Sequence, residues 1–194
     1  MNSRKPFVVA LGGTLREHSS TERALRLIAR RCEQLGAEIM VLSGADIDLP
    51  SYAPDRVEPN EAASRLVDAV RRADAIILGS PGYHGGISGL VKNAIDYIEE
   101  LRGDARCYLD GRAVACVATG AGWQGAVGTL TALRSITHAL RGWPTPLGIA
   151  LNTAEPTFAP DGACLRPELQ QTLDAVADQL MEFVTARADQ RCGV

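Results

Sequence analysis

The feature that most constrains the fold is a regular alternation of short apolar runs with segments whose apolar residues recur every three or four positions. The runs are typical of strands buried on both faces, and the periodic segments of amphipathic helices. We expect strands at residues 6–11, 37–42, 75–78, 113–119 and 146–151. We expect helices at residues 19–35, 60–72, 87–101, from the 120–125 connection to about 140, and 167–186.

This alternation predicts an α/β fold in which a parallel sheet is covered by helices on both faces through right-handed crossovers. Five strands, with a ligand loop directly after the first, favour the flavodoxin-like strand order 2-1-3-4-5 and a three-layer sandwich. A length of 194 residues suits one domain spanning the whole chain, residues 1–194. Asn60 is a suitable N-cap, and the proline-bearing stretch 46–59 is expected to be a long ordered loop.

Composition argues against several functional classes. No apolar run approaches the roughly 20 residues of a membrane helix, and no signal-peptide core precedes the first strand, so we expect a cytoplasmic protein with no membrane partner. A net charge of −3 without a basic stripe makes nucleic acid an unexpected partner. The five cysteines are dispersed, which favours reduced thiols and no metal site, and Cys116 lies in an apolar run typical of the core.

The loop after the first strand has the composition of a phosphate site. It follows two glycines and carries Thr14, Arg16, Ser19, Ser20 and Thr21. Hydroxyls, a guanidinium and the start of a helix can converge on a terminal phosphate. The loop matches neither a Walker motif nor Gly-x-Gly-x-x-Gly, which disfavours a nucleoside triphosphate or a dinucleotide. The alternative is that Ser19 or Ser20 only caps the helix while Thr14 occupies an ordinary turn.

The loop after the third strand is suited to a flat aromatic ring. It consists of Pro81, Gly82, Tyr83, His84 and Gly85. Small residues let the backbone approach a ring closely, and Tyr83 can pack beside it. His84 could instead be an exposed loop residue without a role. A phosphate loop and a ring loop at the same edge of one sheet predict a flavin mononucleotide (FMN) site, and therefore redox chemistry.

The loop after the fourth strand could form a second wall of this site. Its candidate residues are Thr119, Gly120, Gly122, Trp123 and Gln124. Trp123 could also be an interface residue or a partly buried core aromatic. Backbone N–H groups here and in the loop that starts at Pro81 could stabilise the negative charge that reduction places on the flavin. We nominate no catalytic side chain, because the cofactor would supply the reactive chemistry.

Three segments resemble the NADPH-dependent FMN reductase family. Residues 13–21 (GTLREHSST) are similar to that family's Gly-Ser-x-Arg-x-x-Ser-x-Asn, with Thr21 in place of Asn. Residues 80–96 (SPGYHGGISGLVKNAID) are similar to its Ser/Thr-Pro-Glu-Tyr-Asn-Gly-Ser-Ile-Pro-Gly-x-x-Lys-Asn-Ala-Ile/Leu-Asp, with Gly82 for Glu and His84 for Asn. Residues 48–52 (DLPSY) follow its Asp-Leu-Pro-x-Tyr. The replacement of Asn by Thr21 weakens one phosphate contact. Gly82 and His84 fall, by this expectation, at the ring edge.

The resemblance, which spans roughly residues 8–140, implies a specific activity. It implies bound FMN, NADPH or NADH as electron donor, and a small-molecule electron acceptor such as a free flavin, quinone or azo compound. It also implies a homodimer or homotetramer in which a neighbouring subunit lines the site. Hydride would pass from the nicotinamide to flavin N5 and then on to the acceptor.

Three alternatives stay open on the sequence. FMN could be a prosthetic group, or a substrate that leaves reduced to supply a flavin-dependent monooxygenase partner. The chain could be a flavodoxin-type electron carrier that does not oxidise NAD(P)H itself, although such carriers are usually more acidic. It could also be a redox-inactive binding module with a flavin-type fold.

Overall fold

The computed structural model describes residues 4–55 and 60–192, with side chains to residue 188. Its strands are β1 Phe7–Gly12, β2 Glu38–Leu42, β3 Ala75–Tyr83, β4 Gly86–Ile87, β5 Ala113–Gly120, β6 Trp143–Pro144 and β7 Ile149–Asn152. Its α-helices are α1 Ser20–Gln34, α2 Glu61–Arg72, α3 Gly89–Asp96, α4 Trp123–Ala139 and α5 Pro167–Cys192, with 3₁₀ helices η1 Gly44–Ile47 and η2 Tyr97–Leu101.

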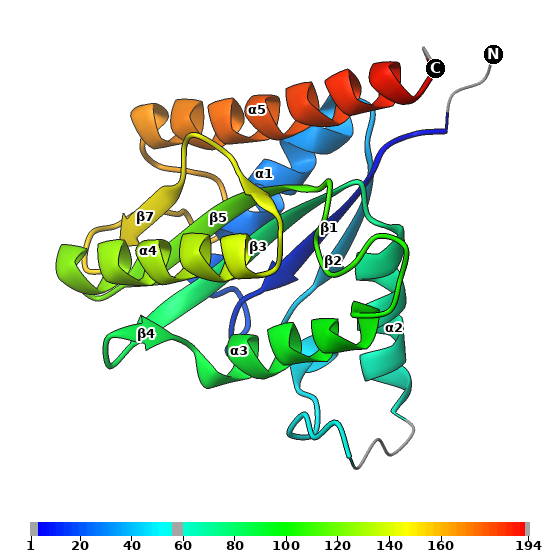
Figure 1. Cartoon of the computed structure of the whole chain (residues 1–194). Helices are drawn as coiled ribbons and strands as arrows, with labels where there is room; N and C mark the ends of the chain where they lie inside the picture. Colours follow the sequence, from blue (N-terminus) through cyan, green and yellow to red (C-terminus); the bar gives the residue numbers. More distant parts are fainter. Residues whose placement is uncertain (1–3, 56–59, 193–194) are drawn as a thin grey trace.

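Helices cover both faces of the sheet, as the sequence predicts (Figure 1). Residues alternate between the faces along β1: Val8 and Ala10 pack against α1 and α5, whereas Val9 and Leu11 face the side of α2, α3 and α4. Two apolar clusters therefore lie on opposite sides of one sheet. This doubly covered arrangement confirms the flavodoxin-like α/β fold class and leaves the carboxyl edge of the strands to carry the connecting loops.

The predicted number and order of strands were wrong. The sheet contains seven strands in the described residues, in the order β2-β1-β3-β5-β6, with β4 and β7 off this path. Both β6 and β7 pair in parallel with β5, through Ala113↔Trp143 and Val117↔Ile149. The strand expected at 146–151 begins only at Ile149, as β7, and the two-residue strand β6 lies before the expected range, at Trp143–Pro144.

The segment predicted as one helix over residues 87–101 has three parts. Gly86 and Ile87 form β4, which pairs antiparallel with the end of β3. The α-helix itself begins at Gly89 and ends at Asp96, and the chain then continues as the 3₁₀ helix η2. The helix predicted from apolar spacing therefore began two residues too early, because Ile87 pairs with β3 instead.

The loop predicted over residues 46–59 is ordered where the structure describes it, although residues 56–59 lie outside the described part. It begins within η1, and Asn93 of α3 then holds it in place. The Asn93 amide donates to the carbonyls of Leu49 and Pro50 at 3.0 and 2.9 Å, and its oxygen accepts from the Tyr52 N–H at 2.8 Å. This contact joins the DLPSY segment to the helix that begins at the carboxyl edge of the sheet.

Two smaller predictions are confirmed. Asn60 caps α2, because its side-chain oxygen accepts a hydrogen bond from the Ala63 N–H at 2.9 Å. Cys116 is a core residue, and burial raises the pKa of its thiol. Within the described residues, no helix is both long enough and apolar enough to cross a membrane.

Candidate functional site

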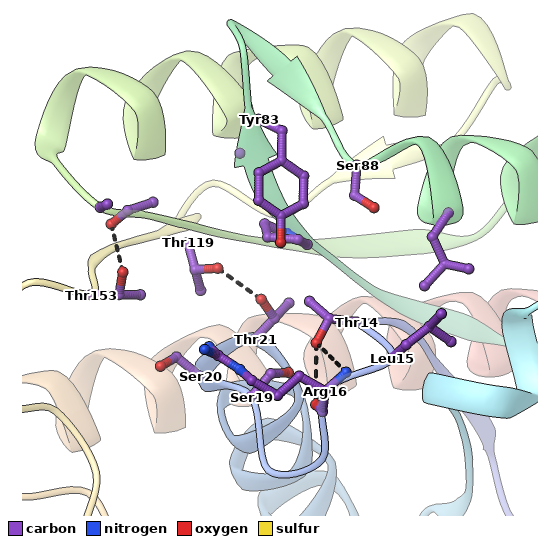
Figure 2. Close-up of a pocket in the computed structure, with 15 residues that line it drawn as sticks. Thr14, Leu15, Arg16, Ser19, Ser20, Thr21, Tyr83, Ser88, Thr119 and Thr153 are labelled. Carbon is purple, nitrogen blue, oxygen red and sulfur yellow. Dashed lines mark hydrogen bonds between the residues drawn. The ribbon is translucent and has the colours of Figure 1, made fainter.

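A cavity of about 610 Å³ opens at the carboxyl ends of β1, β3 and β5 (Figure 2). The loops after these strands supply its walls, which is where open α/β sheets bind ligands. Its volume falls within the range of roughly 300–1,000 Å³ typical of small-molecule sites. The residues that line it are Thr14, Leu15, Arg16, Ser19, Ser20, Thr21, Pro81, Gly82, Tyr83, Ser88, Leu90, Thr119, Gly120, Ala121 and Thr153.

The loop between β1 and α1 is held in shape by its own hydroxyls. The Thr14 hydroxyl accepts from the Arg16 N–H at 3.1 Å and donates to the Arg16 carbonyl at 3.2 Å. Ser19 caps α1, since its hydroxyl accepts from the Glu22 N–H at 3.3 Å. The capping alternative is therefore correct for Ser19, yet both Thr14 and Ser19 also line the cavity.

The floor of the cavity at α1 is suited to an anion. The first turn of α1 presents backbone N–H groups and the partial positive charge of the helix. Arg16 is exposed, makes no ion pair with any carboxylate in the described ranges, and extends toward Ser20 in Figure 2. A guanidinium, free hydroxyls and a helix N-terminus at one end of the cavity form a donor set typical of phosphate sites.

The loop after β3 is a tight β-hairpin. Tyr83 pairs with Gly86 across a two-residue turn, His84–Gly85, whose φ angles of 49° and 90° are both positive. Type I′ hairpin turns require this conformation, which Asn, Gly and His tolerate better than most residues. The side chain of Tyr83 extends from the hairpin into the cavity, with its hydroxyl toward Thr14 in Figure 2.

The structure places Pro81, Gly82 and Tyr83 in the cavity wall, but His84 and Gly85 lie at the turn and do not line it. The expectation that His84 falls at the edge of a bound ring is therefore not supported by its position in this chain. A Cβ at Gly82 would lie 2.3 Å from the Thr129 hydroxyl, whereas a Cβ at Gly85 would meet nothing within 4 Å. Close backbone approach is required at Gly82, and the turn conformation accounts for Gly85.

The loop after β5 contributes less than predicted. Thr119 and Gly120 line the cavity, whereas Gly122, Trp123 and Gln124 do not. Gly122 is the N-cap of α4, and Trp123 begins that helix with half of its side chain exposed. A Cβ at Gly120 would lie 2.8 Å from the Ala126 nitrogen, so this glycine lets α4 start close against β5.

Five lining residues were missed by the sequence predictions: Leu15, Ser88, Leu90, Ala121 and Thr153. Leu15 and Ala121 lie beside predicted residues, and Ser88 precedes α3, so their neighbourhood was a signal. Thr153 follows β7 and had no such signal. Its N–H and hydroxyl both donate to the Gly120 carbonyl, at 2.8 and 3.1 Å, which brings the end of β7 to the cavity.

Two of the predicted residues contact each other in the wall of the cavity. The hydroxyl oxygens of Thr21, in α1, and Thr119, in β5, are 2.7 Å apart, and both side chains are buried (Figure 2). The two residues are 98 positions apart in the sequence. This hydrogen bond joins the first turn of α1 to the end of β5.

Comparison with known proteins places this arrangement in a family. The model of the NADPH-dependent FMN reductases matches residues 6–155, which include the three strands that carry the cavity. A quinone reductase of Pseudomonas putida is 32% identical over 130 residues, which cover 66% of this chain and 67% of that protein. An FMN-dependent NADPH-azoreductase of Staphylococcus haemolyticus is 31% identical over 140 residues, or 71% of each chain.

Solved structures agree on the fold. The flavoenzyme NAD(P)H:(acceptor) oxidoreductase FerB of Paracoccus denitrificans superposes with a TM-score of 0.76 at 22% identity, covering 93% of this chain and 98% of that one. A flavodoxin of Streptococcus pneumoniae superposes less closely, with a TM-score of 0.61 at 12% identity, over 91% and 97% of the two chains. The match to the family model over most of its length shows that this chain belongs to the NADPH-dependent FMN reductase family.

Proposed function

We propose that this protein binds FMN in the cavity between the β1–α1 loop and the β3–β4 hairpin, oxidises NAD(P)H, and reduces a small-molecule acceptor. The observation that carries the proposal is the cavity itself, which combines an anion-binding end with an apolar, glycine-containing wall at the carboxyl edge of the sheet. Family membership supports a reductase over an electron carrier of the flavodoxin type.

The residues of the cavity fit FMN at both ends. Arg16, the hydroxyl of Ser20 and the first turn of α1 would hold the phosphate. Pro81 and Gly82 offer a flat stretch of backbone to a ring, because any side chain at Gly82 would collide with Thr129. Tyr83 would cover the open side of the ring. The cavity therefore has donors for a phosphate at one end, a narrow wall for a ring at the other, and a volume larger than a phosphate alone needs.

FMN bound here would supply the hydride-transfer chemistry that links NAD(P)H to an acceptor. The chain's task is to bind, orient and stabilise charge. Backbone N–H groups near Gly120 and Ala121 would stabilise negative charge at the cavity wall, where α4 begins just beyond them. Tyr83 and Leu90 line the cavity beside the proposed position of the ring. No side chain is required as a general acid or base in this scheme.

We also propose an acceptor class, an oligomeric state and a cellular location, guided by the family. Quinones and azo compounds, named for two relatives, are the acceptor classes we propose to try first. We also propose a homodimer or homotetramer, because Trp123 and Val127 lie one turn apart on α4 with about half of each side chain exposed. The four cysteines whose side chains the structure describes are free thiols, which suits a cytoplasmic location. A monooxygenase partner would follow only if reduced FMN is released.

Anaerobic reduction tests the proposal. Protein loaded with FMN is titrated with NADPH or with NADH, and flavin absorbance is followed before an acceptor is added. We expect bleaching by at least one nucleotide alone and recovery on adding a quinone or azo compound. Bleaching that requires an added reductase would establish an electron carrier instead. Co-purification of stoichiometric FMN would identify a prosthetic group, and turnover of free FMN by colourless protein would identify a substrate.

A further inference from the structure

The buried Thr21–Thr119 contact has a consequence for hydrogen bonding in the cavity. Each hydroxyl carries one O–H donor and two acceptor positions. One O–H is used in the 2.7 Å contact between the two oxygens, whichever of them donates. Neither side chain makes another hydrogen bond to the rest of the chain that the structure describes. The pair therefore has one remaining O–H, and both residues line the cavity.

The position of the pair indicates which part of a ligand this O–H meets. Thr21 lies in the first turn of α1, beside the anion-binding end. Thr119 lies at the end of β5, directly before Gly120. The pair is thus between the end suited to phosphate and the wall suited to the ring. In FMN, the ribityl phosphate arm connects these two parts.

We propose that Thr21 and Thr119 act as one unit that donates a single hydrogen bond to an oxygen of the ribityl phosphate arm. The inference rests on the proposed function. It differs from the family's motif, in which an Asn stands at the position of Thr21. In this chain the side chain at position 21 is joined to the opposite wall, so donation to the ligand is a property of two residues rather than of one.

The unit predicts redundancy between the two hydroxyls. Replacing either threonine by valine removes one O–H and frees the other, so a donor remains in the cavity. Replacing both removes the donor while preserving the shape of the side chains. For one hydrogen bond we expect the affinity of the double variant for FMN to fall roughly three- to tenfold. Each single variant should remain within about 1.5-fold of the wild type, so that the product of the two single losses stays below the loss of the double variant.

Stability should follow a different order from affinity. A single valine leaves a hydroxyl that has lost its partner in a buried place, whereas two valines leave an apolar contact of similar shape. Unfolding of the apo-protein in urea should therefore show that T21V/T119V is no less stable than T21V or T119V. A purely structural pair would change urea stability and leave FMN affinity unchanged in all three variants.

The experiment measures FMN binding to apo-protein by quenching of flavin fluorescence, for the wild type, T21V, T119V and the double variant. T21S and T119S retain the hydroxyl and test for loss of folding, and T137V removes a buried hydroxyl on α4 that donates to the Leu133 carbonyl at 2.9 Å. Riboflavin serves as a second probe. A loss with both flavins assigns the acceptor oxygen to the ribityl chain, and a loss with FMN alone assigns it to the phosphate.

Three results would overturn the inference. One is a single variant that already loses as much affinity as the double. Another is a double variant whose loss is only the product of the two single losses, because two independent contacts would then be present. The third is unchanged affinity in every variant. If the wild type fails to bind FMN, the proposed function itself is wrong, and this result is distinct from the other three.

Discussion

The two loops that meet at the cavity are held in shape by different means. The β1–α1 loop depends on side-chain hydroxyls: Thr14 bonds twice to Arg16, and Ser19 caps α1. The β3–β4 hairpin depends on backbone pairing and on a glycine that leaves no room for a side chain. We therefore expect the first loop to accept substitutions that keep a polar group. We expect the hairpin to accept substitutions only at positions with room for a side chain.

This difference has a counterpart in the departures from the family's motifs. Thr14 and Thr21 replace Ser and Asn, and each carries a hydroxyl that is hydrogen-bonded in the structure. His84 replaces Asn at a positive φ of 49° in the hairpin turn, a conformation that both residue types tolerate. Thr14, Thr21 and Gly82, which stands in place of Glu, all line the cavity, whereas His84 does not. We therefore expect a substitution at Gly82 to affect ligand binding more than one at His84.

The largest effect is expected at Gly120, at the end of β5, where the backbone packs closely, as it does at Gly82 in the hairpin. In Gly120→Ala the new Cβ would lie 2.8 Å from the Ala126 nitrogen, so the start of α4 must move. We expect the free energy of unfolding in urea to fall by about 1–3 kcal/mol, and FMN binding to be lost.

A matched control is available in the same helix. A Cβ at Gly128 meets nothing within 4 Å, so Gly128→Ala should raise stability by up to about 1 kcal/mol through helix propensity. If the two substitutions change the urea midpoint in the same direction, close backbone approach at Gly120 does not explain the position.

The next effect tests the polar loop. Arg16→Ala removes the side chain proposed to pair with the phosphate, and a hydrogen bond to a charged group is worth about 1.5–3 kcal/mol. We expect FMN affinity to fall roughly ten- to hundredfold, while riboflavin, which has no phosphate, binds as before.

Arg30→Ala serves as the control for charge, because Arg30 is an exposed arginine at the far part of α1. Isothermal titration of both variants with both flavins checks the expectation. An equal loss for FMN and riboflavin in Arg16→Ala would place the guanidinium elsewhere than at the phosphate.

A smaller effect separates capping from binding within one loop. Ser19→Ala removes the N-cap of α1 and should lower the free energy of unfolding by about 1 kcal/mol. Ser20→Ala, one residue on, removes a hydroxyl that makes no hydrogen bond to the described part of the chain. We expect it to weaken FMN binding without a measurable change in the thermal midpoint. Equal thermal midpoints for the two variants would show that the cap contributes nothing.

The smallest effect is expected at the tip of the hairpin. His84→Asn keeps a residue that tolerates positive φ, so stability should stay within about 0.5 kcal/mol. His84→Val should cost about 1–2 kcal/mol, because a β-branched residue opposes that conformation. A large change in FMN affinity for His84→Asn would place this side chain at the ligand after all, and would contradict the position described above.

The sequence predicted the parts of the fold that depend on local pattern. The runs at 6–11 and 113–119 correspond closely to Phe7–Gly12 and Ala113–Gly120, because uninterrupted apolar residues signal a strand buried on both faces. The run at 75–78 was too short, since β3 continues to Tyr83. Gly79, Ser80 and Pro81 have the composition of a turn, but pairing with Val117, Ala118 and Thr119 extends the strand. Tertiary pairing overrode local propensity there.

The candidate site shows the same division between local and long-range information. Ten of the predicted residues line the cavity, and each lies in or beside a glycine-containing loop at the end of a strand. Gly122, Trp123 and Gln124 do not line the cavity, because α4 already begins at Trp123 where the glycine-rich sequence predicts a loop. Thr153 could not be predicted, because it reaches the cavity only through its bonds to Gly120.

The central claim is that one FMN molecule spans the two loops, and a crystal structure of the complex with FMN tests it most directly. The account predicts density for the phosphate at the first turn of α1, beside Arg16 and Ser20, and for the ring against Pro81 and Gly82. Phosphate density near Gly120, or a ring bound away from the β3–β4 hairpin, would contradict the account.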